Sequence, residues 1–570
     1  MLHTSHSNSL PSSHKPHLWF FLGMIFIACS ADAGEAVASL ENEVDVRQEG
    51  ETIARLDGEA VPRQENKLTD NASEEMMQPA GTSPGASPGT SVGTSPGTSV
   101  GTSVGASAGR YLPAPAGMPF GDMLQEETLS AIYELYAPYD RADAPGCAVG
   151  IYQNGDMVFS GAFGAANLDY GIPLSDSSRF YMASVSKQVT AAAAGLLVVR
   201  GLLDYEARVS DYLGNWPQWA GEVRVKHLFN HTSGLPDIYD LMDIAGISLS
   251  NVMDIEDYMS VFFNGESLKN SPGAAFSYTN SGYTTLARLV EVVTGEDFSV
   301  FVEKELLNPI GMTATHFHDD RTRVIPNRVI SYAPLADLAD AFDEDGGASQ
   351  ERSQELPVVP FRQTYLSNFQ GVGPGGLYSS IRDWRHWEAF WSGDMELPDE
   401  FSRLRLMMTD REVARGDTLD YAMGLDVEKW QGLWMMGHSG NFMGFRTDVR
   451  RFPQTGLALL TLCNRDDSNP AQMNRSLAKI LLKDLFEAFL MPYEGTYHNE
   501  ELLADFGLSV EDGTLNLSRR LSPNGAMSEE ALDKWRAGSW LLEFQRDDRG
   551  EITGLLVTTG RARNVEFIRK

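Results

Sequence analysis

Apolar and polar positions alternate or cluster in ways that divide much of the chain into strands and helices. Apolar runs flank Asn154-Gly155, a dipeptide that favours two-residue β-hairpins. The run QVTAAAAGLLVVRGLL is almost wholly apolar, which predicts a buried helix that ends at Gly201. Strand-like runs return in 433–464, and 471–490 carries apolar residues at helical spacing. Strands at both ends around a helical middle predict one sheet assembled from distant segments.

Residues 491–570 have a different pattern of apolar and polar positions. Short alternating runs are separated there by Asp-Gly and Arg-Gly turns, as in GLSVEDGTLNLS and QRDDRGEITG. This pattern predicts a small separate all-β domain, either a sheet or a partial barrel.

Residues 34–117 contain no pattern that could pack into a core. The stretch 81–109 repeats the tetrapeptide Gly-Thr/Ala-Ser-Pro/Val/Ala in seven consecutive copies. Small polar side chains bury too little apolar area to offset the entropy of ordering the chain. We therefore expect a disordered linker with a reach of about 50 Å.

An uninterrupted apolar run, LWFFLGMIFIA at 18–28, precedes this linker. Its length is typical of a signal-peptide core, whereas a membrane-spanning helix needs about 20 apolar residues. One interpretation makes 1–33 a signal peptide that is cleaved after Ala33. The other takes FIAC as a lipoprotein box that leaves Cys29 as a lipid anchor. Both predict an exported bacterial protein, periplasmic or anchored to the membrane as a lipoprotein.

Composition narrows the choice of partners. The chain has 570 residues and a net charge of −33, from 45 basic and 78 acidic residues. Such a surface repels phosphate backbones, which excludes nucleic acid as an expected partner. A hydrophobic content of 42% supports a folded interior, and the length suggests two to four domains.

Two cysteines, Cys147 and Cys463, lie in the apolar, strand-like runs PGCAVGIY and LALLTLCN. We expect buried free thiols at both positions. A disulfide between neighbouring strands is the alternative, and it requires an oxidising compartment.

Three short motifs occur in order along the chain, and each is weak evidence by itself. They are Ser184-x-x-Lys187, Tyr278-x-Asn280 and His438-x-Gly440. The order and spacing of the three motifs make them stronger evidence together than singly. Four flanking stretches add to this evidence: RFYMASVSKQ, VKHLFNHTSGLPD, ELLNPIGMTATHF and GPGGLYSSIRDW.

On these motifs and flanks, about 120–490 resembles the serine penicillin-recognising enzymes. That group includes class C β-lactamases, D-alanyl-D-alanine carboxypeptidases, D-aminopeptidases and related esterases. The resemblance implies a β-lactamase/transpeptidase-like α/β domain over 118–490, with an antiparallel sheet flanked by helices plus a helical subdomain. In the peptidase branch of this group, similar C-terminal β domains border or restrict the active site, so the same role for 491–570 is a hypothesis.

The residue types of the first two motifs suit nucleophilic catalysis. A helix that starts near Ser184 places Lys187 one turn on along the same face, and its N-terminal dipole favours an oxyanion. A serine hydroxyl needs a base, and desolvation lowers the pKa of a lysine. We expect Tyr278 to share or relay the proton, and Asn280 to orient Lys187 or hold the substrate amide. Either Lys187 or Tyr278 takes the first proton.

The third motif departs from class C β-lactamases, which carry Lys-x-Gly where this chain has His438-x-Gly440. By resemblance, histidine at this position is typical of the D-aminopeptidase and esterase branches. A histidine is mostly neutral near pH 7, so it offers one hydrogen bond or proton transfer instead of a fixed positive charge. The resemblance also implies that the N–H groups of Asn441 and Ser184 form the oxyanion hole.

The expected function is that of an exported serine hydrolase that forms an acyl-enzyme on D-amino-acid-containing peptides or amides, with no cofactor. A peptidoglycan-derived substrate would suit that class. The alternatives within the fold are a short-chain acyl esterase and a weak β-lactamase. The alternative from another class is a non-catalytic cell-envelope module that binds peptidoglycan fragments.

Two histidine clusters have spacings that resemble those of metal sites. HLFNH places His227 and His231 at i and i+4, but the glutamate of His-Glu-x-x-His is missing and no third ligand is evident. HFHDD, at 316–320, is expected on a loop surface. We interpret both clusters as structural and expect no metal.

Overall fold

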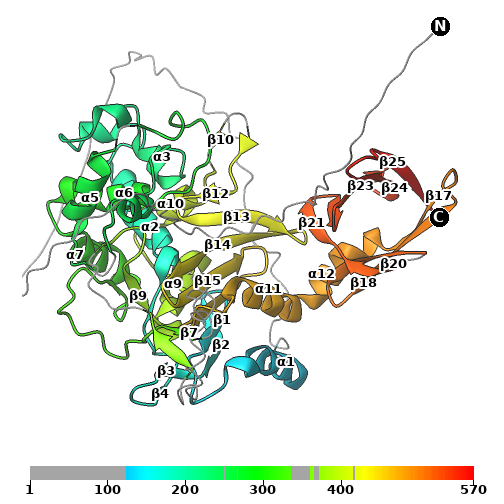
Figure 1. Cartoon of the computed structure of the whole chain (residues 1–570), viewed down its shortest axis with the longest axis horizontal. Coiled ribbons are helices and arrows are strands. Elements are labelled where there is room, and N and C mark those ends of the chain that lie inside the picture. Colours follow the sequence, from blue (N-terminus) through cyan, green and yellow to red (C-terminus); the bar gives the residue numbers. More distant parts are fainter. Residues whose placement is uncertain are drawn as a thin grey trace, which may run out of the picture. The chain divides into compact units, whose positions relative to one another are not determined.

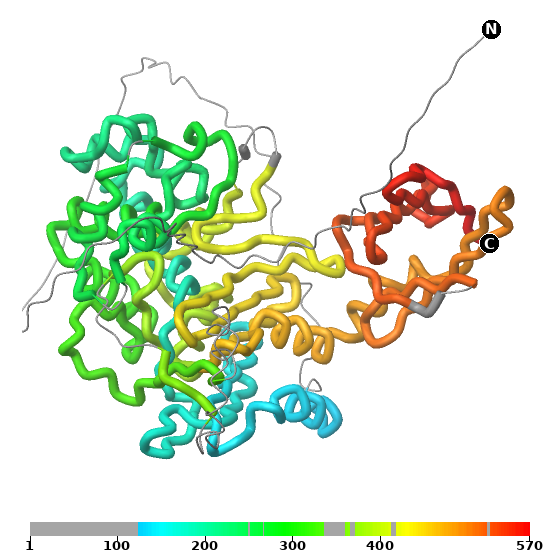
Figure 2. Tube along the Cα trace, in the orientation of Figure 1, coloured from blue at the N-terminus to red at the C-terminus, as the bar shows by residue number. Residues whose placement is uncertain are grey.

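A computed structural model of the chain gives the arrangement of its elements (Figures 1 and 2). The structure describes residues 124–248, 251–265, 267–335, 360–364, 371–411, 413–414, 417–520 and 522–570. The expected signal peptide, the Cys29 anchor and the linker up to residue 117 lie outside the described residues. Within the described part, no helix combines the length and the apolar content that a membrane crossing needs.

The central element is a seven-stranded antiparallel sheet assembled from both ends of the catalytic region, as the sequence predicts (Figure 1). The hairpin predicted at Asn154-Gly155 is present, and both residues have positive φ, at 50° and 85°. In spatial order, the strands are β12 (Tyr421–Ala422), β13 (Leu425–Trp430), β14 (Leu433–Phe442), β15 (Phe445–Phe452), β16 (Leu457–Cys463), β1 (Cys147–Gln153) and β2 (Asp156–Phe163).

Helices cover both faces of this sheet. Successive residues of β1 point to opposite sides, so this strand contributes side chains to the cores on both faces. Cys147, Val149 and Ile151 pack in the core with α1 (Glu126–Tyr136) and α11 (Pro470–Leu481). Ala148 and Tyr152 pack on the other face, in the core that contains α2 (Ser186–Val199) and α9 (Ile381–Ser392). Every residue of β1 is therefore buried.

The predicted apolar helix is α2 (Ser186–Val199), and it is buried from Ser186 to Leu197. It ends two residues before Gly201, whose φ is +73°. Further helices lie around it: α3 (Val225–Phe229), α4 (Ile238–Ile244), α5 (Ile255–Phe263), α6 (Asn280–Thr294), α7 (Phe298–Val302) with a π-helical turn at Glu303–Leu307, α9 (Ile381–Ser392) and α10 (Asp399–Met408).

Short strands connect these helices. Three of them form one small sheet in the order β5 (Phe180–Tyr181), β9 (Leu377–Ser379) and β6 (His316–Phe317). The remaining pairs are β3 (Ala165–Asn167) with β4 (Ile172–Pro173), β7 (Tyr332–Pro334) with β8 (Phe361–Gln363), and β10 (Val413–Ala414) with β11 (Asp417–Thr418).

Two expectations about local structure are wrong. His316 and His318 do not lie on a loop surface, because both are only 3% exposed and His316 belongs to β6. The apolar pattern of 471–490 is not one helix, because the backbone leaves helical geometry at Leu482 (φ −114°, ψ 21°). After this break, α12 (Lys483–Leu490) packs Phe486 against Trp430, with ring centroids 5.0 Å apart.

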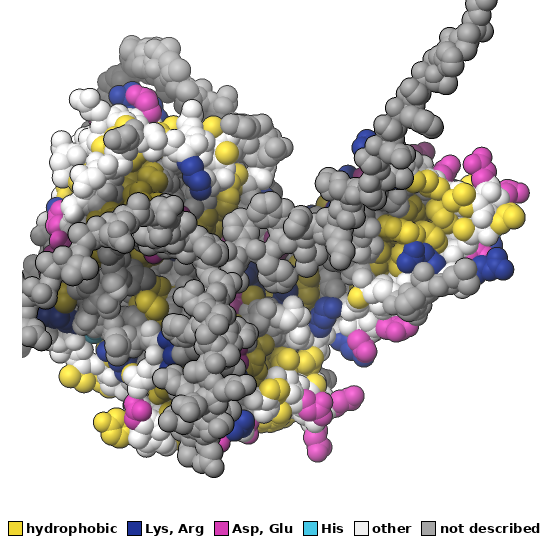
Figure 3. Space-filling view, viewed as in Figure 1, with side chains coloured by type: hydrophobic (Ala, Val, Ile, Leu, Met, Phe, Trp, Pro, Cys, Tyr) yellow, Lys and Arg dark blue, Asp and Glu magenta, His cyan; other side chains and the backbone are white. Residues whose placement is uncertain are grey.

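The C-terminal residues form the predicted all-β domain, a nine-stranded antiparallel sheet (Figures 1 and 2). Its two edge strands, β20 and β21, are consecutive in sequence, so the sheet curls toward a barrel. In spatial order, the strands are β20 (Ser522–Ala526), β19 (Thr514–Arg519), β18 (Ala504–Glu511), β17 (Gly495–Asn499), β25 (Val565–Arg569), β24 (Ile552–Thr558), β23 (Trp540–Arg546), β22 (Lys534–Ala537) and β21 (Ser528–Ala531). Hydrophobic side chains are also visible on the surface of this domain (Figure 3).

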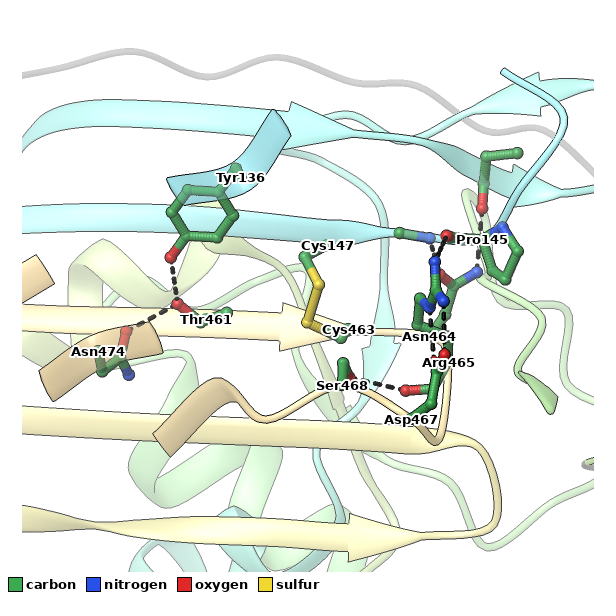
Figure 4. Close-up of a disulfide and its surroundings, with 12 residues drawn as sticks. Tyr136, Pro145, Cys147, Thr461, Cys463, Asn464, Arg465, Asp467, Ser468 and Asn474 are labelled. Carbon is green, nitrogen blue, oxygen red and sulfur yellow. Dashed lines mark hydrogen bonds and ion pairs between the residues drawn. A yellow bond between two sulfur atoms is a disulfide. The ribbon is translucent and has the colours of Figure 1, made fainter. Parts of the chain in front are cut away.

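Cys147 and Cys463 form a disulfide, so the expectation of free thiols is wrong and its alternative is confirmed (Figure 4). The two residues are directly opposite in the antiparallel pair of β1 and β16, with Cα atoms 4.1 Å apart. Both are fully buried. The bridge therefore joins the first strand of the sheet to a strand 316 residues later.

Replacement of both cysteines by alanine is expected to lower the free energy of unfolding by about 2–5 kcal/mol, because the bridge restricts the unfolded chain. Denaturant titration of the wild type and the double variant measures this difference. As a separate check, alkylation of the denatured, unreduced protein is expected to leave the Cys147 and Cys463 peptides unmodified. Alkylation of both peptides without reductant would contradict the disulfide.

Candidate active site

Ser184 lies in a turn that the surrounding strands hold on both sides. The chain passes from β5 into a short 3₁₀ helix, Ala183–Val185, which continues directly into α2. Met182 N donates to Leu377 O at 2.8 Å, and the Met182 carbonyl accepts from Thr447 Oγ1 at 2.9 Å. Ala183 has a φ of +48°, an unusual value for a residue with a side chain. The main chain next to Ser184 is thus strained and tightly positioned.

Lys187, in the first turn of α2, points its amine at three oxygen atoms. Its Nζ lies 3.0 Å from Ser184 Oγ, 2.8 Å from Asn280 Oδ1 and 3.1 Å from the carbonyl of Pro374. The side chain is 0% exposed. Burial therefore lowers the pKa of the Lys187 amine to about 7, although the negative charge of Asp237 opposes the shift.

These three contacts fix where the protons must lie when the amine is neutral. A neutral amine has two N–H bonds and one lone pair. The Asn280 and Pro374 oxygens can only accept hydrogen bonds, so they take the two N–H groups. The lone pair of Lys187 then faces the Ser184 hydroxyl, which is the arrangement that a general base requires.

Tyr278 approaches Ser184 from a different segment. Its hydroxyl lies 3.1 Å from Ser184 Oγ, and its ring centroid lies 4.9 Å from Lys187 Nζ. Desolvation raises the pKa of the phenol, and the hydrogen bond with Ser184 opposes this only in part. Tyr278 therefore stays protonated at neutral pH, although the residue as a whole is 39% exposed.

Asn280 is held by a residue to which sequence reasoning assigned no role, Asp237. Asn280 is the first residue of α6, and both its main-chain N–H and its Nδ2 donate to Asp237 Oδ2, at 2.6 and 3.0 Å. The other oxygen of Asp237 caps α4 by accepting from Tyr239 N at 2.9 Å. The signal in the sequence that could have singled out Asp237 is its position directly before a helical run, where aspartate commonly caps a helix.

Gly440 lets β14 lie directly against the turn that carries Ser184. A side chain at this position would place its Cβ 2.6 Å from the Met182 carbonyl and 3.0 Å from Ala183 Cβ. The pairing of β14 with β13 ends at Gly437, so the strand edge beyond that residue is not paired with β13.

Asn441 directs its main-chain N–H toward this open edge. Phe442 and Phe445 are paired across a two-residue turn, so they exchange the last hydrogen bonds between β14 and β15. Because hydrogen-bonded and non-bonded positions alternate along an antiparallel pair, the N–H of Asn441 points away from β15.

His438 lies on the same strand but does not present a free ring nitrogen. The residue is 5% exposed, its Nδ1 lies 2.6 Å from the Ser439 carbonyl, and its Nε2 lies 3.1 Å from Tyr421 Oη. Burial lowers the pKa of the imidazole, so His438 is neutral at pH 7. The substrate contact expected of His438 stays a prediction.

The histidines of HLFNH take up separate structural positions. His227 Nδ1 accepts from Arg224 N at 3.1 Å and thereby caps α3. His231 Nδ1 accepts from Thr279 N at 3.2 Å. No group of three or more histidine, cysteine or acidic side chains close enough to hold a metal occurs in the described ranges.

A cavity of about 560 Å³, lined in part by Trp391 and Arg451, includes none of the residues that the three motifs supply.

Comparisons with known proteins agree with this architecture. The Beta-lactamase family model matches residues 134–482. Penicillin-binding protein 4* of Bacillus subtilis is 29% identical over 322 residues, which cover 55% of this chain and 67% of that protein. A D-aminopeptidase of Gluconobacter oxydans is 24% identical over 387 residues, which cover 67% of this chain and 66% of the relative. The chain thus spans about two thirds of the length of these relatives.

Solved structures show the same fold at lower identity. The octameric penicillin-binding protein homologue from Pyrococcus abyssi is 20% identical, with a TM-score of 0.50, over 79% of this chain and 100% of that chain. The D-amino acid amidase from Ochrobactrum anthropi SV3 complexed with D-phenylalanine is also 20% identical, with a TM-score of 0.50, over 64% and 99%. The predicted fold class and the resemblance are confirmed: the chain belongs to the β-lactamase family of serine hydrolases.

Proposed function

We propose that this protein is an exported hydrolase that hydrolyses amide bonds next to D-amino acids through a covalent acyl-enzyme on Ser184. The observation that carries the proposal is the buried amine of Lys187. Two of its three oxygen partners can only accept hydrogen bonds, so only the Ser184 hydroxyl can donate to its lone pair.

Acylation begins when Ser184 Oγ attacks the substrate carbonyl carbon. The Oγ–C bond forms while the hydroxyl proton passes to Lys187 Nζ, 3.0 Å away. A base with a pKa of about 7 suits this transfer at neutral pH, because a substantial fraction of it is unprotonated there and it is still basic enough to hold the proton.

The negative charge on the former carbonyl oxygen needs donors that are already in place. Ser184 is in the first helical turn, where main-chain N–H groups have no intrahelical acceptor. The N–H of Asn441 points to the same open edge, which Gly440 brings against the turn. This pair supports an oxyanion hole, and loss of one such donor typically costs about 3 kcal/mol of transition-state stabilisation.

Collapse of the tetrahedral intermediate breaks the bond to the leaving nitrogen, which must receive a proton. Tyr278 is a neutral phenol 3.1 Å from Ser184 Oγ, so it can donate to the departing amine while the proton held by Lys187 replaces the one it gives. Water then attacks the acyl-enzyme, and the same groups act in reverse to free Ser184.

The chemistry of β14 favours an amine-bearing or neutral substrate over one that is bound through a carboxylate. The strand sequence LWMMGHSGNF contains no lysine or arginine, and His438 is neutral. A fixed positive charge for a substrate carboxylate is therefore missing from this strand, which disfavours carboxypeptidase and β-lactamase activity. Similarity to the Gluconobacter protein named D-aminopeptidase supports the choice of D-amino-acid amides and peptides.

Export is part of the proposal, and two features support it. The apolar run at 18–28 is typical of a signal peptide. The disulfide between Cys147 and Cys463 suits an oxidising compartment such as the periplasm.

The Ser184→Ala variant is expected to lose at least about a thousandfold in turnover of D-alanine p-nitroanilide, because the attacking oxygen is gone. Intact-mass analysis of rapidly quenched wild type should show an acyl adduct that this variant lacks. A p-nitrophenyl ester and a fluorescent penicillin serve as parallel substrates. Faster turnover of the ester would favour the esterase alternative, whereas absence of turnover and of adducts with all three would favour a non-catalytic binding module.

The pH dependence of kcat/KM is expected to rise through about pH 7 to a plateau, because protonated Lys187 cannot accept the Ser184 proton. Asp237→Asn removes a negative charge that stabilises the protonated amine, while its amide oxygen can still accept from Asn280. The rise should therefore move to lower pH in this variant. An unchanged profile would show that another group controls the rate.

A further inference from the structure

His231 is a buried residue for which the proposed catalytic steps provide no role. It is 0% exposed and adopts a φ of +53°, in the left-handed region that residues with side chains seldom occupy. Its ring lies against that of Tyr278, with centroids 4.3 Å apart. A strained and buried polar residue in contact with Tyr278 suggests a function in the site.

His231 fixes the main chain on both sides of Tyr278. Its carbonyl accepts from Ser277 N at 2.7 Å, and its Nδ1 accepts from Thr279 N at 3.2 Å. The main-chain N–H groups of both sequence neighbours of Tyr278, Ser277 and Thr279, are thus bonded to one residue. The direction in which the Tyr278 hydroxyl leaves the main chain depends on these two bonds.

The second ring nitrogen of His231 connects this segment to the central sheet. Its Nε2 lies 3.2 Å from Tyr421 Oη, and the same hydroxyl lies 3.1 Å from Nε2 of His438. Tyr421 is 2% exposed and belongs to the edge strand β12. A chain of three buried side chains therefore runs from the segment around Tyr278 to β14, the strand that carries Asn441.

Hydrogen-bonding rules fix the protons along this chain. Thr279 N–H can only donate, so His231 Nδ1 is bare and its Nε2 carries the proton toward Tyr421. The Ser439 carbonyl can only accept, so His438 carries its proton on Nδ1, and its bare Nε2 accepts a hydrogen bond from the Tyr421 hydroxyl. Both imidazoles are then neutral, in agreement with the lowered pKa that burial gives each of them.

We propose that His231, Tyr421 and His438 form a positioning unit that fixes the Tyr278 hydroxyl and the open edge of β14 relative to each other. The inference rests on the proposed acyl transfer at Ser184. Tyr278 reaches Ser184 from one segment and Asn441 from another, and a misplacement of about 1 Å in such a site costs on the order of 100-fold in rate. All three are positioning residues, since they act through Tyr278 and β14.

Two variants interrupt this chain with little change in shape. Tyr421→Phe removes the bridging hydroxyl and keeps the ring. His231→Asn keeps an acceptor oxygen near the position of Nδ1 for Thr279 N–H, tolerates positive φ, and cannot reach Tyr421. Tyr152→Phe is the matched control, because Tyr152 is 0% exposed and donates one hydrogen bond, to Ile381 O at 2.6 Å, outside this unit.

The measurement is the rate at which a fluorophosphonate labels Ser184. In this reaction the Ser184 Oγ–P bond forms, fluoride leaves, and the serine proton passes to Lys187, so no natural substrate is needed. Labelling over a range of probe concentrations separates the maximal rate constant from probe binding. Thermal unfolding of each variant measures stability in parallel.

Tyr421→Phe and His231→Asn are each expected to lower the maximal labelling rate constant about tenfold. A change of this size corresponds to the free energy of about one hydrogen bond. Probe binding should stay within about twofold of wild type. The double variant should lose little more than either single variant, because both remove the same link. Tyr152→Phe should label at the wild-type rate, even where its melting temperature falls by a similar amount.

Wild-type labelling rates in folded Tyr421→Phe would overturn the inference, as would losses that multiply in the double variant. If neither variant folds, His438→Gln, which leaves a donor for the Ser439 carbonyl, provides the same test at the other end of the chain. A wild-type protein that the probe does not label at Ser184 would instead overturn the proposed function.

Discussion

The site depends on one interaction, the contact between a desolvated amine on Lys187 and the hydroxyl of Ser184. A lysine pKa lowered from 10.5 to about 7 corresponds to roughly 5 kcal/mol of unfavourable burial at neutral pH. That cost applies in full below pH 7 and vanishes above the pKa of an exposed lysine, because the unfolded chain binds the proton more tightly. The rest of the fold must therefore offset it.

Several parts of the structure bury this amine and hold its partners in place. Helix α2 is buried over most of its length, which excludes water from the amine, and Asn280 and Pro374 satisfy the two N–H groups. Asp237 holds Asn280 in turn. The central sheet completes the site, since Gly440 allows β14 to approach the turn around Ser184. The catalytic groups come from distant segments, and only the folded sheet and helices bring them together.

The sequence predicted many of the regular elements, because hydrophobic period and turn dipeptides are local signals. The hairpin at Asn154-Gly155 and the buried helix α2 are examples. The order of the motifs pointed to Ser184, Lys187, Tyr278 and Asn280, which the structure brings together. The sequence could not predict contacts that depend on tertiary pairing. The partner of Cys147 lies on a strand 316 residues away, and the Pro374 contact uses a main-chain carbonyl that every residue possesses. The burial of His316 likewise depends on tertiary packing, which the local pattern HFHDD does not show.

The most direct test of the account is an NMR titration of the Lys187 side chain in protein labelled on its lysine side chains, with the Lys187→Met variant identifying the signal. The account predicts a resonance that titrates with a midpoint near pH 7, well separated from the signals of exposed lysines. A midpoint near 10 would mean that the amine stays protonated at neutral pH, and Ser184 would then lack the base on which the proposed chemistry depends.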